Sequence, residues 1–141
     1  MKIYLASPLF DEIQKDKIKR VVKRLRREGH VVYSPMEHQI SNAWALENYV
    51  WSKKVFDEDL RALNEADAVY AIYYGMDSDS GTAWEIGYAY AMKKQVNIFV
   101  SDEKNLQSLM IINGADNVYA LTPYTENGEK KPVWIKKIIQ S

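Results

Sequence analysis

The run Ala68–Tyr74 (AVYAIYY) most constrains the fold, because it is continuously apolar and rich in residues that favour β-strands. A strand with one wet face alternates apolar and polar side chains, whereas this run offers apolar side chains to both faces. It is therefore predicted to be the central strand of a parallel sheet covered on both sides. With 141 residues, the chain is long enough to bury such a core within one domain.

Further strands and helices alternate on either side of this run. The other predicted strands are Ile3–Ala6, His30–Ser34, Val96–Val100 and Asn117–Leu121. The predicted helices are Phe10–Arg27, Tyr49–Ala66, Thr82–Lys93 and a closing helix, Pro132–Gln140. Met36–Asn48 has weak periodicity and is interpreted as a long functional loop with local helix. The alternation predicts an α/β fold: a single doubly wound (flavodoxin- or Rossmann-like) domain over residues 1–141, with a roughly five-stranded parallel sheet flanked by helices.

The first predicted helix, Phe10–Arg27, has one apolar and one basic face. Its apolar residues recur at helical spacing, at Ile18, Val21, Val22 and Leu25. The basic face is interpreted as solvent-exposed, since the apolar stripe already accounts for the pattern. The whole chain has 19 basic and 19 acidic residues, so no binding of a nucleic acid polymer is expected.

Composition excludes several kinds of chemistry. The chain has no cysteine and two histidines, which excludes disulfides, thiol nucleophiles and Cys-ligated zinc and disfavours a His-rich metal site or a Ser/His triad. Neither a dinucleotide-binding glycine fingerprint nor a P-loop motif is present. The chemistry is expected to use carboxylates, hydroxyls and amides, with no metal and no cofactor.

No targeting or membrane segment is expected. The apolar start, Met1–Ala6, reaches the charged residues Asp11 and Glu12 too soon for a signal peptide. Nowhere do eighteen apolar residues run together, as a membrane-spanning helix would require. A cytoplasmic protein without a membrane partner is therefore predicted.

Ligands of open parallel sheets bind beyond the carboxyl ends of the strands. Three segments leave such ends in this chain: Ser7–Phe10, Pro35–Ile40 and Gly75–Gly81. Their polar side chains are the first candidates for a site: Ser7, Glu37, His38, Gln39, Asp77, Ser78, Asp79 and Ser80.

The segment Asp79–Gly87 (DSGTAWEIG) is the most informative of the chain. Ser80 or Thr82 is expected to cap the following helix. Glu85 then falls in its first or second turn, where the helix dipole favours an ionised carboxylate that could act as a covalent nucleophile. From spacing alone, ordinary capping is the favoured explanation of these polar residues.

Two other candidates have simple structural explanations when taken alone. Asp59, beside Asp57 and Glu58, fits a solvated helix face. Tyr4, inside the first strand, fits core packing with its hydroxyl paired.

Four segments in matching order and spacing resemble the nucleoside 2-deoxyribosyltransferases over nearly the whole chain. They are Lys2–Phe10, Ser34–Gln39, Phe56–Leu60 with Ala66–Val69, and Asp79–Gly87. The last is the most specific. The resemblance implies a retaining exchange of bases at the glycosidic carbon of a 2′-deoxynucleoside, by the double-displacement logic of retaining glycosidases.

The resemblance also implies roles for individual residues. Glu85 falls on the nucleophile, Tyr4 on a tyrosine that orients it, and Asp59 on the acid that carries the proton of the base. The implied substrate-binding residues are Gln39 for the base, Asp79 for the sugar hydroxyls, and Ser7, Gly81 and Ser108 around them. The implied partners are small molecules, namely 2′-deoxynucleosides and free nucleobases, with purine and pyrimidine preference left open.

Ser108 departs from the family pattern, because many transferases have asparagine there. In the family this segment reaches a neighbouring subunit's site, which implies a homo-oligomer built from dimers, up to a hexamer, with shared active sites. A serine at this position resembles the related deoxynucleoside 5′-monophosphate N-hydrolases. Hydrolysis of deoxynucleoside 5′-monophosphates is therefore the alternative activity. The acid Asp79 and the absence of arginine from Ser7–Phe10 oppose a bound phosphate. A catalytically silent nucleotide-binding sensor domain is the third interpretation.

Overall fold

A computed structural model describes residues 1–39, 48–133 and 138–139. Its principal sheet contains five strands in the order β2-β1-β3-β4-β6, all parallel. These strands are β1 (Lys2–Ala6), β2 (Val31–Tyr33), β3 (Ala68–Tyr73), β4 (Gln95–Val100) and β6 (Asn117–Ala120). The predicted α/β fold with a doubly wound parallel sheet is confirmed, and the Ala68–Tyr74 run is its buried central strand.

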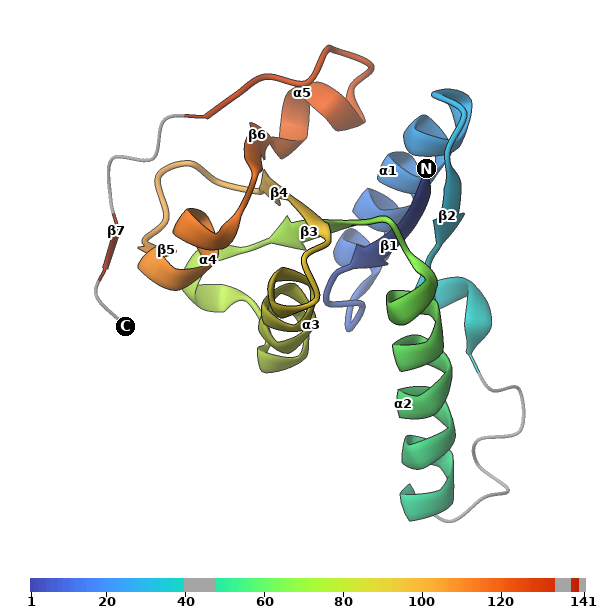
Figure 1. The fold of residues 1–141 in the computed structure, drawn as a ribbon. Helices are drawn as coiled ribbons and strands as arrows, with labels where there is room; N and C mark the ends of the chain where they lie inside the picture. The colour runs from blue at the N-terminus through green and yellow to red at the C-terminus, as the bar shows by residue number, and fades with distance from the viewer. Residues whose placement is uncertain (40–47, 134–137, 140–141) are drawn as a thin grey trace.

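Helices cover both faces of this sheet (Figure 1). α1 (Glu12–Arg27) and the short α5 (Leu121–Thr125) pack on one face, in a core that includes Leu25, Phe99 and Tyr124. α2 (Asn48–Glu65), α3 (Ser80–Ala91) and the short α4 (Leu109–Gly114) lie on the other face. Alternate residues of β3 enter the two cores, which explains why that strand is apolar throughout.

The chain order creates a switch point between β1 and β3. From β1 the chain moves outward to β2, then returns to the opposite side of β1 to form β3. Connections therefore diverge at the carboxyl ends of β1 and β3, where open sheets bind their ligands. Tyr4 of β1 pairs in register with Tyr33 of β2, so both side chains extend from the same face of the sheet.

α1 illustrates how the sequence pattern becomes structure. The four apolar residues predicted to share a face are all buried in the core. The helix begins two residues later than predicted, because Asp11 is its N-cap and accepts a hydrogen bond from the Gln14 amide at 2.8 Å. The chain leaves the helix through Gly29, whose φ of 94° favours glycine.

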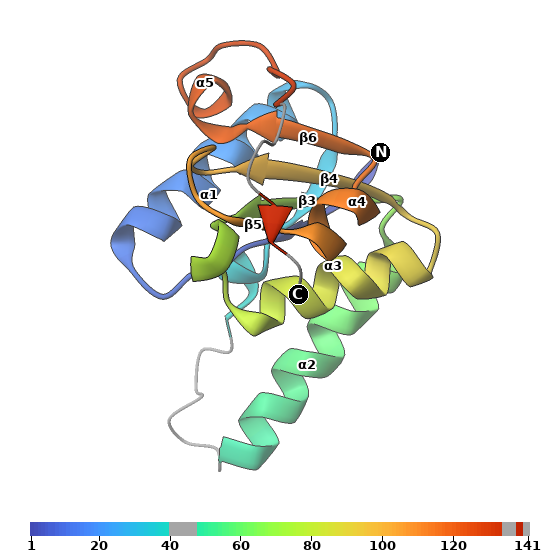
Figure 2. The same ribbon diagram turned by 90° about the vertical axis from the view of Figure 1, so that its left-hand side faces the viewer.

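α2 projects beyond the sheet. In Figures 1 and 2 its first turns lie away from the rest of the molecule, while its last turns pack on the core through Ala62 and Leu63. The 3₁₀ turns η1 (Pro35–His38) and η3 (Gly75–Asp77) follow β2 and β3. η1 supplies the local helix predicted within Met36–Asn48; residues 40–47 lie outside the described residues. No helix in the described ranges is both long enough and apolar enough to span a membrane.

The predicted closing helix, Pro132–Gln140, is wrong where the structure describes it. Pro132 forms an antiparallel bridge with Tyr119, and the Val133 amide donates to the Val118 carbonyl at 3.0 Å. β7 (Ile138–Ile139) then pairs with β5 (Gln107–Ser108). The edge of β6 offers unpaired backbone groups, so the extended chain is stabilised by tertiary hydrogen bonds that local sequence periodicity does not reveal.

Candidate active site

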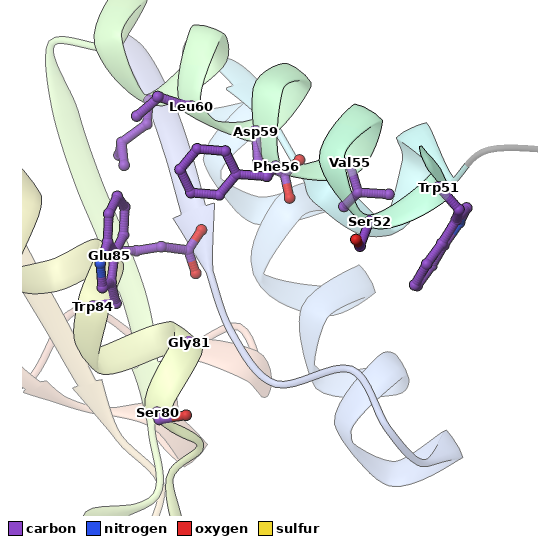
Figure 3. Close-up of a pocket in the computed structure, with 11 residues that line it drawn as sticks. Trp51, Ser52, Val55, Phe56, Asp59, Leu60, Ser80, Gly81, Trp84 and Glu85 are labelled. Carbon is purple, nitrogen blue, oxygen red and sulfur yellow. The ribbon is translucent and has the colours of Figure 1, made fainter. Parts of the chain in front are cut away.

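A pocket opens at the switch point, between α2 and α3 (Figure 3). It consists of two adjoining hollows of about 490 and 480 Å³, each large enough for a small organic ligand. The hollows share four lining residues: Trp51, Val55, Asp59 and Glu85. In Figure 3 the Glu85 side chain extends from α3 toward α2, which carries Asp59.

Glu85 is held by the first strand. It lies in the second turn of α3, and its carboxylate accepts a hydrogen bond from the hydroxyl of the fully buried Tyr4. Burial raises the pKa of Glu85 to about 7, the negative charges of Asp59 and Asp79 act in the same direction, and the Tyr4 hydrogen bond opposes them. Burial thus has a larger effect on this carboxyl group than the helix dipole, which acts mainly within the first turn.

Asp59 differs from its acidic neighbours on α2. Asp57 is exposed and pairs with Lys53 at 2.7 Å, whereas Asp59 is half-buried and lines the pocket. The Tyr33 hydroxyl donates to Asp59 Oδ1 at 3.2 Å. Burial raises the pKa of Asp59, and the Tyr33 hydrogen bond opposes that shift. The simple interpretation of Asp59 as part of a solvated helix face is thus wrong.

Asp79 has a structural role as well as a place in the pocket. It is the N-cap of α3, and its side chain accepts hydrogen bonds from the Thr82 amide at 3.3 Å and from the Thr82 hydroxyl. The prediction that Ser80 or Thr82 caps the helix is therefore wrong. A Cβ at Gly81 would lie 2.9 Å from Asp79 Oδ2, so a larger residue at this position would require the Asp79 carboxylate to move.

Most of the remaining candidates also meet here. Ser7 and Gln39 line the pocket, Ser7 with its hydroxyl donating to the Pro8 carbonyl at 2.9 Å and Gln39 directly after η1. Four of the remaining candidates are absent from the described lining residues of this pocket: Glu37, Asp77, Ser78 and Ser108. Ser108 lies on β5, beside η3, and its backbone amide donates to the Tyr73 hydroxyl at 3.0 Å. Ser108 is thus placed away from the described lining residues of its own chain's pocket.

Aromatic side chains complete the pocket. Phe56 and Trp84 meet edge to face, with ring centroids 5.8 Å apart, and Trp51 borders both hollows. Sequence reasoning assigned no role to Tyr33 or to these three rings. Tyr33 has one usable signal: it ends the second strand, which a doubly wound sheet places beside the first.

The described lining residues have a pronounced charge pattern. They include the carboxylates of Glu58, Asp59, Asp79 and Glu85, and the imidazole of His38, but no lysine or arginine. Within the described ranges, no group of three or more Asp, Glu or His side chains is arranged to hold a metal ion. The arrangement offers a carboxylate poised for nucleophilic attack, a second carboxyl group for proton transfer, and aromatic surfaces for a planar ligand.

Comparison with known sequences gives this arrangement its context. Residues 3–133 match the sequence profile of the family described as nucleoside 2-deoxyribosyltransferase. The chain belongs to this family. Within it, the chain is 23% identical to the nucleoside deoxyribosyltransferase of Lactobacillus leichmannii over 92% of its own length and 90% of the relative's.

Two further similarities bear on nucleoside 2-deoxyribosyltransferase-like chemistry. The solved structure of a 2-deoxyribosyltransferase from Bacillus psychrosaccharolyticus is 33% identical, with a TM-score of 0.80 over 95% of this chain and 100% of that one. A Thermofilum pendens protein that carries the name of a 2′-deoxynucleoside 5′-phosphate N-hydrolase is 31% identical over 68% of this chain and 65% of its own. The chain is thus similar both to proteins named for transfer and to a protein named for hydrolysis.

Proposed function

We propose that this protein transfers 2-deoxyribose between nucleobases, with retention at the anomeric carbon, through a covalent deoxyribosyl–Glu85 intermediate. The observation that carries the proposal is the convergence of Glu85, held by Tyr4, and the half-buried Asp59 on one pocket. The membership of the chain in a family of deoxyribosyl-transferring enzymes supports it.

In the first proposed step, a Glu85 oxygen attacks C1′ of a 2′-deoxynucleoside. A C–O bond forms, the glycosidic C–N bond breaks, and the bonding electron pair leaves with the base. Asp59 supplies the proton that the departing base nitrogen needs. Burial raises the pKa of Asp59, which favours its protonated form relative to an exposed aspartate.

In the second proposed step, a different base attacks C1′ from the side that the first base left. The ester C–O bond breaks, Glu85 recovers its carboxylate, and Asp59 takes the proton of the incoming base. Two inversions give net retention. The sugar lacks a 2′-hydroxyl, so positive charge at C1′ is less destabilised and a carboxylate is a sufficient nucleophile.

The proposed binding contacts follow from the lining of the pocket. Gln39, beside His38 at the end of η1, is proposed to contact the base. Asp79 is proposed to contact the sugar hydroxyls, with Ser7 and Gly81 beside it. The aromatic rings of Trp51 and Trp84 give apolar surface against which a planar base can pack.

Hydrolysis of deoxynucleoside 5′-monophosphates is the second candidate. It is favoured by Ser108 and by the relative named as an N-hydrolase. The four lining carboxylates, with no lysine or arginine among the described lining residues, disfavour a phosphate dianion in this chain's own pocket. We therefore place unphosphorylated deoxynucleosides first.

A product assay tests these alternatives. The protein is incubated with 2′-deoxyinosine, with and without free adenine, and in parallel with 2′-deoxyinosine 5′-monophosphate. Transfer predicts that deoxyadenosine forms only when adenine is present, and that Glu85→Ala abolishes it. Preferential release of hypoxanthine from the monophosphate would support the hydrolase instead. Binding of deoxynucleoside without turnover of any substrate would support the silent sensor domain.

We also propose that Ser108 serves the site of a neighbouring subunit in a homo-oligomer. Its position beside η3, away from the described lining residues of its own pocket, supports a contribution to another chain.

A further inference from the structure

Tyr33 lies behind the pocket and connects Asp59 to the sheet. Its hydroxyl donates to Asp59 Oδ1 at 3.2 Å, and Tyr33 itself is absent from the described lining residues. A ligand in the pocket would therefore meet Asp59 but not Tyr33. Any effect of Tyr33 on catalysis would pass through the carboxyl group that it contacts.

The ring of Tyr33 stacks on two other rings. Its centroid lies 5.6 Å from that of the Tyr4 ring, with planes 14° apart. The centroid of the His38 ring lies 4.3 Å away, with planes 8° apart. The register of β1 with β2 places Tyr4 beside Tyr33, and His38 comes from η1, which follows β2. This stack of Tyr4, Tyr33 and His38 restricts the position of the Tyr33 hydroxyl.

The outer end of the stack is fixed by an ion pair. Arg26 donates to both carboxylate oxygens of Glu37, at 2.9 and 2.6 Å, and also to the Val32 carbonyl at 2.9 Å. Glu37 precedes His38 in η1, so this bidentate contact ties the turn to α1 and β2. The position of His38 over Tyr33 is therefore supported from outside the pocket.

We propose that Tyr33 is a positioning residue for the transfer reaction, which holds the Asp59 carboxyl group with Oδ1 turned toward the sheet and Oδ2 available to the nucleobase. The proposal rests on the proposed function, in which Asp59 exchanges a proton with the base. The same stack reaches Glu85 through the hydroxyl of Tyr4. The stacked rings of Tyr4 and Tyr33 thus hold Glu85 and Asp59 in a fixed position relative to each other.

The hydrogen bond also has a chemical consequence. When the glycosidic bond breaks, the proton moves from Asp59 Oδ2 to the base nitrogen, and the bonding electron pair leaves with the base. Asp59 then carries a negative charge that the Tyr33 hydroxyl stabilises. Other ionisable groups act on Asp59 from the surrounding elements: Glu58 from α2, His38 from η1, Tyr4 from β1 and Glu85 from α3.

A double-variant cycle tests whether Tyr33 acts through Asp59. Single-turnover release of hypoxanthine from 2′-deoxyinosine is measured for the wild type, Tyr33→Phe, Asp59→Asn and the double variant. Tyr33→Phe is expected to slow release about 10-fold in the wild-type background, less than the loss of a general acid. In the Asp59→Asn background it should change the rate by less than about 2-fold. Equal effects of Tyr33→Phe in both backgrounds would overturn the proposal.

Tyr124→Phe is a matched control. The Tyr124 hydroxyl also donates to a carboxylate, Glu28 Oε1 at 3.0 Å, but it lies in the core on the opposite face of the sheet. This variant loses the same type of hydrogen bond and should leave the release rate within about 2-fold of the wild type. A slower rate in both tyrosine variants would assign the effect to general destabilisation.

A second measurement does not depend on turnover. The carboxyl carbon of Asp59 is titrated by ¹³C NMR in the wild type and in Tyr33→Phe. Loss of the hydroxyl donor should raise the pKa of Asp59, while Tyr124→Phe leaves it unchanged. An unchanged pKa in Tyr33→Phe would refute the link between the two residues. An inactive wild type with a shifted Asp59 titration would instead refute the proposed function and leave the Tyr33–Asp59 link standing.

Discussion

The Tyr4 hydroxyl donates a hydrogen bond to the Glu85 carboxylate, joining residues that lie 81 positions apart in the sequence. Tyr4 is on the central part of the sheet and Glu85 is on the helix that covers it. The bond stabilises the ionised form of a carboxylate whose burial favours the protonated form. It therefore lowers the pH at which the nucleophile becomes available.

Tyr4→Phe should move the pH dependence of the reaction. The pKa of Glu85, about 7 in the wild type, should rise without the donor, so kcat/KM should reach its plateau at a higher pH, by about 1 unit. The measurement is kcat/KM against pH for base exchange. Tyr70→Phe is the control, because the Tyr70 hydroxyl accepts from Lys130 at 2.9 Å in the opposite core. Superimposable profiles for Tyr4→Phe and the wild type would exclude this role of Tyr4.

Glu85→Gln should abolish turnover and stabilise the fold at alkaline pH. The folded protein holds the Glu85 proton more tightly than the unfolded chain, with a pKa of about 7 against 4.5. Stability is therefore lost as pH rises between these values, and the full cost is present above about pH 7. Gln carries no charge, so the variant should gain about 1–3 kcal/mol near pH 8 and almost nothing near pH 4. Urea unfolding at the two pH values measures the difference, and an equal gain at both would contradict the argument.

Gly81→Ala and Gly87→Ala form a matched pair within α3. The Cβ of Ala at position 81 would meet Asp79 Oδ2 at 2.9 Å, whereas at position 87 nothing lies within 4 Å. Gly87→Ala should keep activity and raise the unfolding free energy by up to about 1 kcal/mol, because alanine favours the helix. Gly81→Ala should displace the Asp79 carboxylate and lower kcat/KM about 10-fold or more. Steady-state kinetics and thermal unfolding of both variants test this prediction. Equal activities of the two variants would contradict a role of Asp79 in substrate binding.

Variants of Ser108 and Glu85 should restore each other's activity when they are combined in one oligomer. Ser108→Trp would block a neighbouring site, and Glu85→Ala removes the nucleophile of its own site. Co-expression of the two inactive variants would create mixed oligomers, in which some sites combine an intact Glu85 with an intact Ser108. Activity should return to about a quarter of the wild-type level if pairs of subunits share sites at random. The control mixture, Glu85→Ala with Glu85→Gln, should stay inactive, and an equally inactive Ser108→Trp mixture would show that sites are not shared.

The sequence contains enough information for the core of the fold. The continuous apolar run Ala68–Tyr74 predicted a strand buried on both faces, the helical stripe of α1 predicted one buried helix face, and the structure confirms both. The C-terminal segment could not be predicted in this way. Pro132 and the segment Ile138–Ile139 pair with distant strands, so their conformation depends on tertiary hydrogen bonds rather than on local pattern.

The candidate site shows the same division. Sequence pattern identified the segment that contains Glu85, and the family resemblance singled out Asp59 and Tyr4. The raised pKa of Glu85 could not be predicted from the sequence, because the burial that causes it depends on how α3 packs against β1. The role proposed for Tyr33 could not be predicted for a related reason. It depends on the register of β1 with β2 and on the ring contact with His38, and local sequence pattern reveals neither.

The two indoles beside the pocket give the protein an intrinsic fluorescence signal for ligand binding. Trp51 and Trp84 are two of the four tryptophans in the chain, and they lie on opposite walls of the pocket with 38% and 50% of their surface exposed. A nucleobase that enters between these helices displaces water from both rings and should change their emission. Ligand occupancy can then be recorded without a label, even in a Glu85→Gln protein that turns over nothing. Affinity and turnover thus become separately observable in one sample.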